Sequence, residues 1–143
     1  MERKYCASVY VVDFETEKTL LMYNHKIDKW LQPGGHIKSE IFELPSECAK
    51  RETLEETGYE IEIIGKKLCG DIQPFALGRY INKVGNMIDV QYVGIPKSHL
   101  DSNEEGNKIG FFSVDEMIEM NVDPEIIEKV RDILINYRIY VNN

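Results

Sequence analysis

The sequence has few cysteines, and their spacing supports neither a zinc clamp nor a disulfide framework. Three are present among 143 residues, at Cys6, Cys48 and Cys69. They stand too far apart for a Cys-x-x-Cys zinc site, and an odd number argues against a disulfide-rich fold. We therefore expect three reduced thiols, most of them buried as small apolar side chains.

Long apolar runs are also missing. No stretch approaches the ~18 consecutive apolar residues of a membrane helix, and no basic stretch followed by an apolar run marks a secretory signal. We expect no membrane partner and a cytoplasmic location. The length, with 43% hydrophobic and 29% charged residues, suits one domain over residues 1–143 with a core of its own.

Positive charge is scarce. There are 17 Lys and Arg against 25 Asp and Glu, which gives a formal net charge of -8. Because affinity for nucleic acid and for anionic membranes comes largely from cations, nucleic acid is not expected as the main partner. A small phosphate compound would be repelled as well unless divalent cations lay between it and the protein. The charge is thus a first indication of a metal, although many acidic proteins are simply soluble.

Strand-like segments dominate the sequence outside one central helix and a helical C-terminal part. Apolar, β-branched and aromatic runs predict strands at residues 4–12, 19–23, 59–64, 70–80, 87–95 and 109–112. The Pro-Gly-Gly at residues 33–35 predicts a shaped loop within 29–36, and the polar stretch 96–108 predicts a second loop.

Helices are predicted where capping residues precede helical apolar spacing. Ser113 and Glu116 form a capping box that opens a short helix ending near Met120. Asp123 and the proline after it open the last helix. The apolar residues of that helix favour core packing over contact with a partner helix, and they are Ile126, Val130, Ile133, Leu134 and Tyr137. The order of elements predicts a mixed α/β (α+β) sheet with helices on its faces.

The central helix, predicted over residues 45–57, carries a concentration of negative charge. Pro45 suits its first position, and Gly58 suits the left-handed residue that ends it. Glu52 lies one turn from both Glu55 and Glu56, so the three carboxylates gather on one edge. These carboxylates repel one another, and the helix dipole also disfavours anions near the C-terminus. Mg²⁺ or Mn²⁺ would offset this repulsion, because hard cations bind carboxylate oxygens; the alternative is a solvated acidic face.

Residues 35–59 resemble the box of the Nudix hydrolase (MutT-like) family, written G-x5-E-x7-R-E-U-x-E-E-x-G-U with U a bulky apolar residue. The positions that match in register are Glu43, Arg51, Glu52, Glu55, Glu56, Gly58 and Tyr59. Two departures are present. Seven residues instead of five separate Gly35 from Glu43, which places a two-residue insertion within 38–42, and Thr53 stands where an aliphatic residue is usual. The insertion leaves the helix intact but affects the adjoining loop, and Thr53 predicts a packing cost.

The resemblance implies a Nudix-type α/β/α sandwich and a role for each matching residue. Glu52 and Glu56 are expected as first ligands of Mg²⁺ or Mn²⁺, then Glu55, together with the backbone carbonyl of Gly35. Arg51 is expected to orient carboxylates and to pair with Glu43. The predicted catalytic set contains Glu52, Glu55, Glu56 and Arg51.

The general base is less defined, because in the family it is a box glutamate or a glutamate on a distant loop. Glu105, or Glu104, lies in such a loop, where a solvated loop tip is the equal alternative. His36 is expected in a structural or phosphate-proximal role. Outside the box, Phe75 and Tyr80 are candidates to stack on a base, and Arg79 to meet a phosphate. Aromatic side chains in a sheet are more often core, and an isolated cation is more often at the surface.

The reaction implied is hydrolysis of a phosphoanhydride bond in a nucleoside diphosphate linked to another moiety. Pro74, sixteen residues after Gly58, favours nucleotide sugars such as ADP-ribose. The short chain favours a (d)NTP pyrophosphatase equally, and a capped RNA end contains the same bond. A non-catalytic nucleotide sensor is the alternative function. The sequence leaves open whether the protein forms a homodimer.

Overall fold

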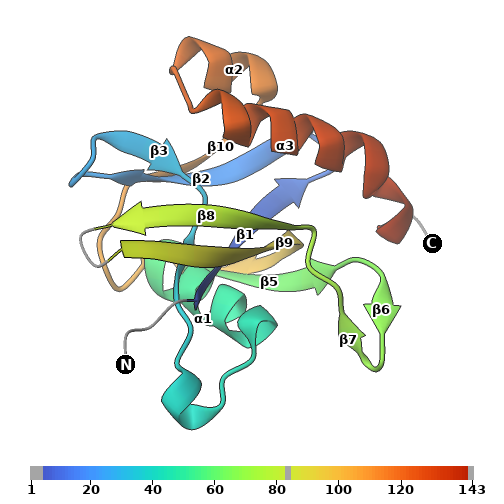
Figure 1. The fold of residues 1–143 in the computed structure, drawn as a ribbon. Coiled ribbons are helices and arrows are strands. Elements are labelled where there is room, and N and C mark those ends of the chain that lie inside the picture. Colours follow the sequence, from blue (N-terminus) through green and yellow to red (C-terminus); the bar gives the residue numbers. More distant parts are fainter. Residues whose placement is uncertain (1–4, 83–84, 142–143) are drawn as a thin grey trace.

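The computed structural model describes residues 5–82 and 85–141 and shows strands sandwiched between helices (Figure 1). The large sheet contains β1 (Tyr5–Asp13), β2 (Lys18–Asn24), β3 (Lys29–Leu31), β4 (Gly34–His36), β5 (Tyr59–Ile64), β8 (Ala76–Asn82), β9 (Gly85–His99) and β10 (Ile109–Phe112). A separate ribbon contains β6 (Lys67–Leu68) and β7 (Asp71–Ile72). The helices are α1 (Pro45–Thr57), α2 (Val114–Glu119) and α3 (Pro124–Asn136), with 3-10 turns η1 (Ser39–Ile41) and η2 (Arg138–Tyr140).

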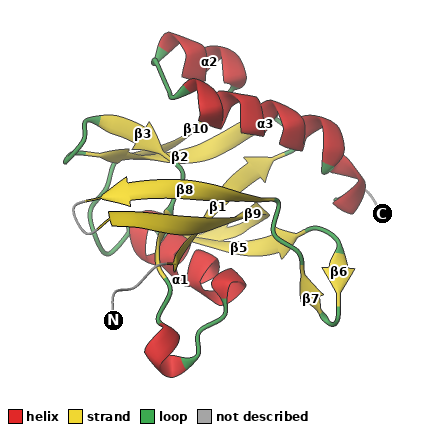
Figure 2. Ribbon diagram, viewed as in Figure 1, coloured by secondary structure: helices red, strands yellow, loops and turns green. Residues whose placement is uncertain are grey.

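Strand β1 lies in the middle of the sheet, whose order is β10-β2-β1-β9-β5. It runs parallel to β9 and antiparallel to β2 and β4. Figure 2 shows α2 and α3 on one side of the strands and α1 on the other. The predicted mixed sheet with helices on both faces is therefore confirmed.

The two faces of β1 contribute to two separate cores. Tyr10 and Val12 pack with the apolar residues of α2 and α3, whereas Val9 and Val11 pack with Cys48 and others on the α1 side. Successive side chains of a strand point to opposite faces, so one apolar strand supplies both layers. The predicted apolar stripe of α3 lies in the first core, as expected.

Strand β1 divides the sheet because its two ends have different antiparallel partners. Near its C-terminal end Val12 pairs with Thr19 of β2, whereas Ser8 pairs with Gly34 of β4. The prediction of an irregular loop through the glycines was wrong, since residues 34–36 are a strand. A Cβ on Gly34 would lie 2.6 Å from the Ala7 carbonyl oxygen, so glycine is what allows β4 to approach β1 this closely.

The second loop prediction was wrong at its start. Strand β9 continues through Pro96 to His99, because β5 pairs with it along this length. Proline lacks the N–H that a ladder needs, and the register shifts between Glu60 and Ile61, opposite Pro96. The remainder of the stretch, residues 100–108, is irregular as predicted.

The predicted helix boundaries are confirmed. Helix α1 begins at Pro45 and ends before Gly58, whose φ of 80° is left-handed. Ser113 and Glu116 exchange both hydrogen bonds of the capping box, at 2.8 and 3.2 Å. The Asp123 side chain accepts a hydrogen bond from the backbone of Glu125 and caps α3. No helix in the described part of the chain is both long and apolar enough to span a membrane.

The two departures from the family pattern have local consequences. The inserted segment forms η1 and then turns at Phe42, which has a φ of 58° and is 89% exposed. Thr53 is fully buried, and its hydroxyl donates to the carbonyl of Ala49 at 2.7 Å. The hydroxyl is thereby satisfied within the helix, which limits the packing cost. Cys6 and Cys48 are buried free thiols, and Cys69 is an exposed one.

Candidate active site

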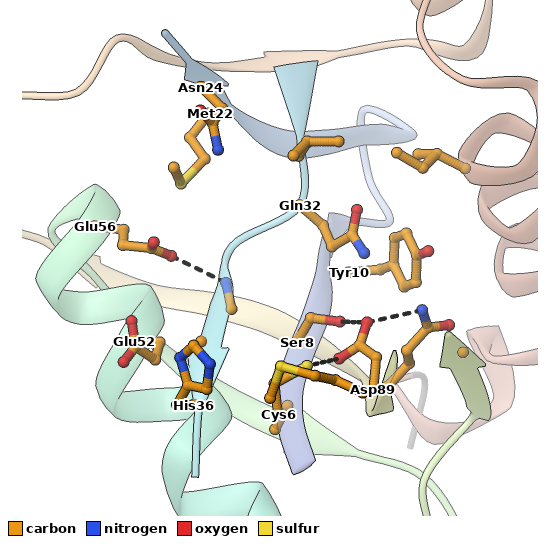
Figure 3. Close-up of a pocket in the computed structure, with 18 of the residues that line it drawn as sticks. Cys6, Ser8, Tyr10, Met22, Asn24, Gln32, His36, Glu52, Glu56 and Asp89 are labelled. Atoms are coloured by element: carbon orange, nitrogen blue, oxygen red, sulfur yellow. Dashed lines mark hydrogen bonds between the residues drawn. The ribbon is translucent and has the colours of Figure 1, made fainter. Parts of the chain in front are cut away.

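A cleft of about 920 Å³ opens where the sheet divides, between β2 and β3 on one side and β8 and β9 on the other. The glycine strand β4 and the carboxylates of Glu52 and Glu56 line one part of it. Figure 3 shows these two side chains on the same side of the cleft as His36. Its volume is in the range of small-molecule sites.

Glu56 is held against the glycine strand. Its Oε1 accepts a hydrogen bond from the backbone N–H of Gly34 at 2.9 Å. Burial is the largest cause that raises the pKa of Glu56, to about 8, and the charges of Glu52, Glu105 and Glu55 raise it further against the effect of the Gly34 hydrogen bond. A carboxylate with this environment gains from a cation, because a cation offsets both the burial and the repulsion.

Glu52 occupies the space beside the next glycine. A Cβ on Gly35 would lie 2.6 Å from each Glu52 oxygen, so a side chain at this position would displace the carboxylate from its present place. Burial raises the pKa of Glu52, and the charges of Glu55 and Glu105 add to this, whereas Arg51 opposes it. The carbonyl oxygen of Gly35 lies 3.5 Å from the Cys48 thiol, and Gly35 pairs with Ala7 in the ladder between β4 and β1.

Arg51 fastens the acidic residues together. Its Nε and Nη2 donate to the two oxygens of Glu43 at 2.7 and 3.1 Å, and its Nη1 donates to Glu52 at 2.8 Å and to Glu55 at 3.3 Å. The bidentate pair lowers the pKa of Glu43, whose side chain is only 8% exposed. The expected contact between Arg51 and Glu43 is thus present. Arg51 also donates to the carbonyl of His36, which ties α1 to β4.

The loop over residues 100–108 distinguishes the two glutamates that the sequence left open. The charge of Glu105 contributes to raising the pKa of both Glu52 and Glu56. Asn107 connects this loop to α1, because its side-chain amide donates to the carbonyl of Glu56 at 3.1 Å and to Glu105 at 3.3 Å. The structure gives Glu104 no comparable contact within the described residues.

The three residues expected to bind substrate outside the box differ in their position relative to the cleft. Arg79 is exposed and lines the cleft, and its Nε donates to Asn86 at 3.4 Å. Phe75 is partly buried and packs against the core, edge-on to Tyr10 and Tyr137. The strand position of Tyr80 is described, but its side chain lies outside the described part of the structure.

Sequence reasoning missed a polar group in the same cleft. Ser8, Asp89 and Gln91 are buried polar residues on β1 and β9, and Lys129 of α3 reaches Gln91. The pattern Met87, Asp89, Gln91 alternates toward one face of β9 and was the available signal. The apolar character of the strand as a whole obscured it.

The comparisons with known proteins agree with this geometry. The model of the NUDIX domain matches residues 3–132. A NUDIX family hydrolase from Clostridium perfringens is 25% identical and aligns over 94% of this chain and 97% of its own, with a TM-score of 0.78. A UDP-X diphosphatase is 18% identical over 96% of this chain and 65% of its own, with a TM-score of 0.70. An Ap4A hydrolase from C. elegans is 15% identical over 91% and 95%, with a TM-score of 0.67. No curated protein matches the sequence.

The fold, with the acidic helix α1 beside the glycine strand, is that of a hydrolase of the NUDIX family. The chain belongs to the NUDIX domain family, since the family model matches nearly its whole length. It is a Nudix pyrophosphohydrolase, as the fold and the family agree.

The donor atoms fit a hard divalent cation, which Nudix hydrolases generally use. Glu52 and Glu56 supply carboxylate oxygens on one edge of α1, beside Gly34 and Gly35 of β4. No cluster of three His, Cys, Asp or Glu side chains suited to a metal is gathered within residues 5–82 and 85–141. One or two carboxylates are within the donor set of a hard divalent cation that completes its shell with water and substrate phosphates.

Proposed function

We propose that this enzyme hydrolyses a phosphoanhydride bond in a nucleoside diphosphate linked to another group, and that the reaction depends on Mg²⁺ or Mn²⁺. The linked group is a sugar, as in ADP-ribose, or a further phosphate, as in a (d)NTP. Two structural relatives, a UDP-X diphosphatase and an Ap4A hydrolase, carry the names of nucleotide substrates, which supports this class.

The observation that carries the proposal is the arrangement of Glu52 and Glu56 around the glycine strand. Glu56 accepts a hydrogen bond from the Gly34 N–H, and Glu52 fills the space beside Gly35. Two carboxylates and a glycine backbone without side chains therefore meet at the cleft. A divalent cation bound there would orient a water and neutralise charge on the phosphates. A raised pKa means that the environment favours the protonated carboxyl group, whereas a bound cation would favour the ionised one.

Other side chains of the site hold the carboxylates in position and receive the phosphates. Arg51 joins Glu43, Glu52 and Glu55, which restricts the movement of the acidic edge. The cleft also contains cations, although the net charge is -8, and they include Lys26, Lys29, Lys38 and Arg79. Cations that line a cleft raise the local concentration of an anionic substrate.

Glu105 is the residue we propose as general base. It lies close enough to influence Glu52 and Glu56 electrostatically, and its loop is exposed, so a water between it and the phosphate is accessible to solvent. The hydrogen bond from Asn107 orients its carboxylate. Geometry comes before pKa in choosing a base, and Glu105 has the better geometry of the two loop glutamates.

The test is cleavage of a substrate panel by the purified protein. Nucleoside triphosphates, dinucleoside polyphosphates and nucleotide sugars would be incubated with Mg²⁺ or Mn²⁺, with EDTA, and with EDTA followed by excess metal. We expect one compound class to be cleaved, no cleavage in EDTA, and recovery when the metal is returned. Cleavage that persists in EDTA would contradict the metal dependence, and a folded protein that cleaves no member of the panel would contradict the substrate class.

A further inference from the structure

A second group of polar side chains lies at the other end of the cleft. Its centre is Asp89, which is 8% exposed. Ser8 Oγ and Gln91 Nε2 both donate to Asp89 Oδ2, at 2.9 and 3.0 Å. Figure 3 shows Asp89 and Ser8 across the cleft from Glu52 and Glu56. The acidic helix edge does not use these residues.

The orientation of Gln91 is fixed by its two neighbours. Lys129 Nζ donates to Gln91 Oε1 at 2.9 Å, and the Asp89 carboxylate accepts from Gln91 Nε2. Lysine only donates and an ionised carboxylate only accepts, so a single orientation of the amide satisfies both. Gly78 leaves space for this amide, since a Cβ there would lie 2.6 Å from Gln91 Nε2 and would displace it. The carboxylate is therefore held rigidly.

Accepting capacity remains on this carboxylate. The contact described at Asp89 Oδ1 is the Cys6 thiol at 3.7 Å, and the same thiol lies 3.7 Å from the carbonyl of Ile88. One thiol proton serves these two acceptors weakly. Gln32 also lines the cleft, and its Oε1 is buried with no hydrogen-bond partner among the described residues. Figure 3 shows the Gln32 side chain next to that of Tyr10.

The unmet acceptors and the walls around them suit a flat heterocycle with N–H groups. Apolar side chains line the same cleft, and they are Met22, Leu31, Met87 and Ile126. A base has apolar faces and a polar edge, whereas a sugar is polar on all sides, so the walls favour the base. Ser8 of β1 pairs with Gly34 on one side and Gln91 on the other. Two strand spacings, about 10 Å, thus separate the glycine strand from β9, a distance that a nucleoside spans.

We propose that Asp89 and Gln32 recognise an amino-bearing nucleobase of the substrate, whose N–H groups donate to the Asp89 carboxylate and to the Gln32 carbonyl. The inference rests on the proposed function, because it concerns the nucleoside half of the substrate whose phosphates lie at Glu52 and Glu56. Ser8, Gln91 and Lys129 act as positioning residues for the carboxylate.

Matched substrates test the assignment. GTP and ITP differ by one exocyclic amino group, and so do ATP and purine riboside triphosphate. We expect the wild type to prefer the amino-bearing member of at least one pair by roughly 10-fold or more in kcat/KM. Asp89→Asn, which keeps the shape of the side chain, should reduce that ratio to below about threefold. Gln32→Met is a second variant for the case in which Asp89→Asn does not fold.

The outcomes separate this inference from the proposed function. Calorimetric measurement of the binding of the same pairs to Glu56→Gln, in the presence of Mg²⁺, reports base recognition without requiring cleavage. Amino-dependent binding without cleavage by the wild type would support the base site and contradict the hydrolysis. Equal cleavage of both members of each pair would overturn the base site. Cleavage rates that differ only between ribonucleotides and deoxyribonucleotides would overturn it as well. An equal loss for both members in Asp89→Asn would make Asp89 a structural residue and would overturn it as well.

Discussion

Glu56 should destabilise the metal-free protein at alkaline pH. Burial, together with the charges of Glu52, Glu105 and Glu55, raises its pKa from 4.5 to about 8. Between these values the folded protein retains a proton that the unfolded chain has released, so the free energy of unfolding falls as pH rises through the window. Glu56→Gln keeps an acceptor for the Gly34 N–H and removes the charge. We therefore expect this variant to be more stable than the wild type above pH 8 and equal to it near pH 4.5.

The magnitude follows from the same two pKa values. The interval from 4.5 to about 8 corresponds to at most about 5 kcal/mol, at ~1.36 kcal/mol per unit. Because Glu56 is only partly buried and water screens it, we expect about 2 kcal/mol, or about 5 °C in Tm. Urea unfolding of EDTA-treated protein between pH 4.5 and 9 measures it, with the exposed Glu119→Gln as control. A stability difference that does not change with pH, or a less stable variant at pH 8.5, would refute the reasoning.

Three further predictions concern the Arg51–Glu43 ion pair, the proposed general base and the glycine strand β4. Arg51→Lys cannot form the bidentate pair with Glu43, so the free energy of unfolding in a denaturant titration should fall by about 1–2 kcal/mol; an unchanged value would show that the pair is not stabilising. Glu105→Gln should lower kcat by about 100-fold and its neighbour Glu104→Gln by less than about twofold, and equal effects would exclude Glu105 as the base. Gly34→Ala places a Cβ 2.6 Å from the Ala7 carbonyl oxygen, so it should lower Tm by several degrees in a thermal melt, and an unaltered Tm would contradict the tight approach of β4 to β1.

The helices and most strands could be predicted because their signals are local. Pro45 and Gly58 bound α1, and the capping pair Ser113 and Glu116 opens α2, each within a few residues. The strand β4 could not be predicted, since a glycine pair carries no strand propensity and pairs only because β1 lies beside it. The extension of β9 through Pro96 likewise depends on β5, a partner that is distant in sequence.

The candidate site divides in the same way. The acidic edge of α1 follows from helical spacing, so Glu52, Glu55 and Glu56 could be grouped from the sequence alone. The assembly around Asp89 could not, because it joins β1, β9 and α3 through contacts such as that of Lys129 with Gln91. Periodicity indicates which face a residue occupies but not which distant residue faces it. For the same reason the sequence could not show that Phe75, a substrate candidate, packs against the core.

The central claim is that the carboxylates beside the glycine strand perform the hydrolysis. It is tested most directly by kcat on the best substrate of the panel, with saturating Mg²⁺, for the wild type, Glu56→Gln and the exposed control Glu119→Gln. We predict that Glu56→Gln loses at least about 100-fold while it remains folded, and that Glu119→Gln stays within about twofold. A folded Glu56→Gln protein with wild-type kcat would contradict the account.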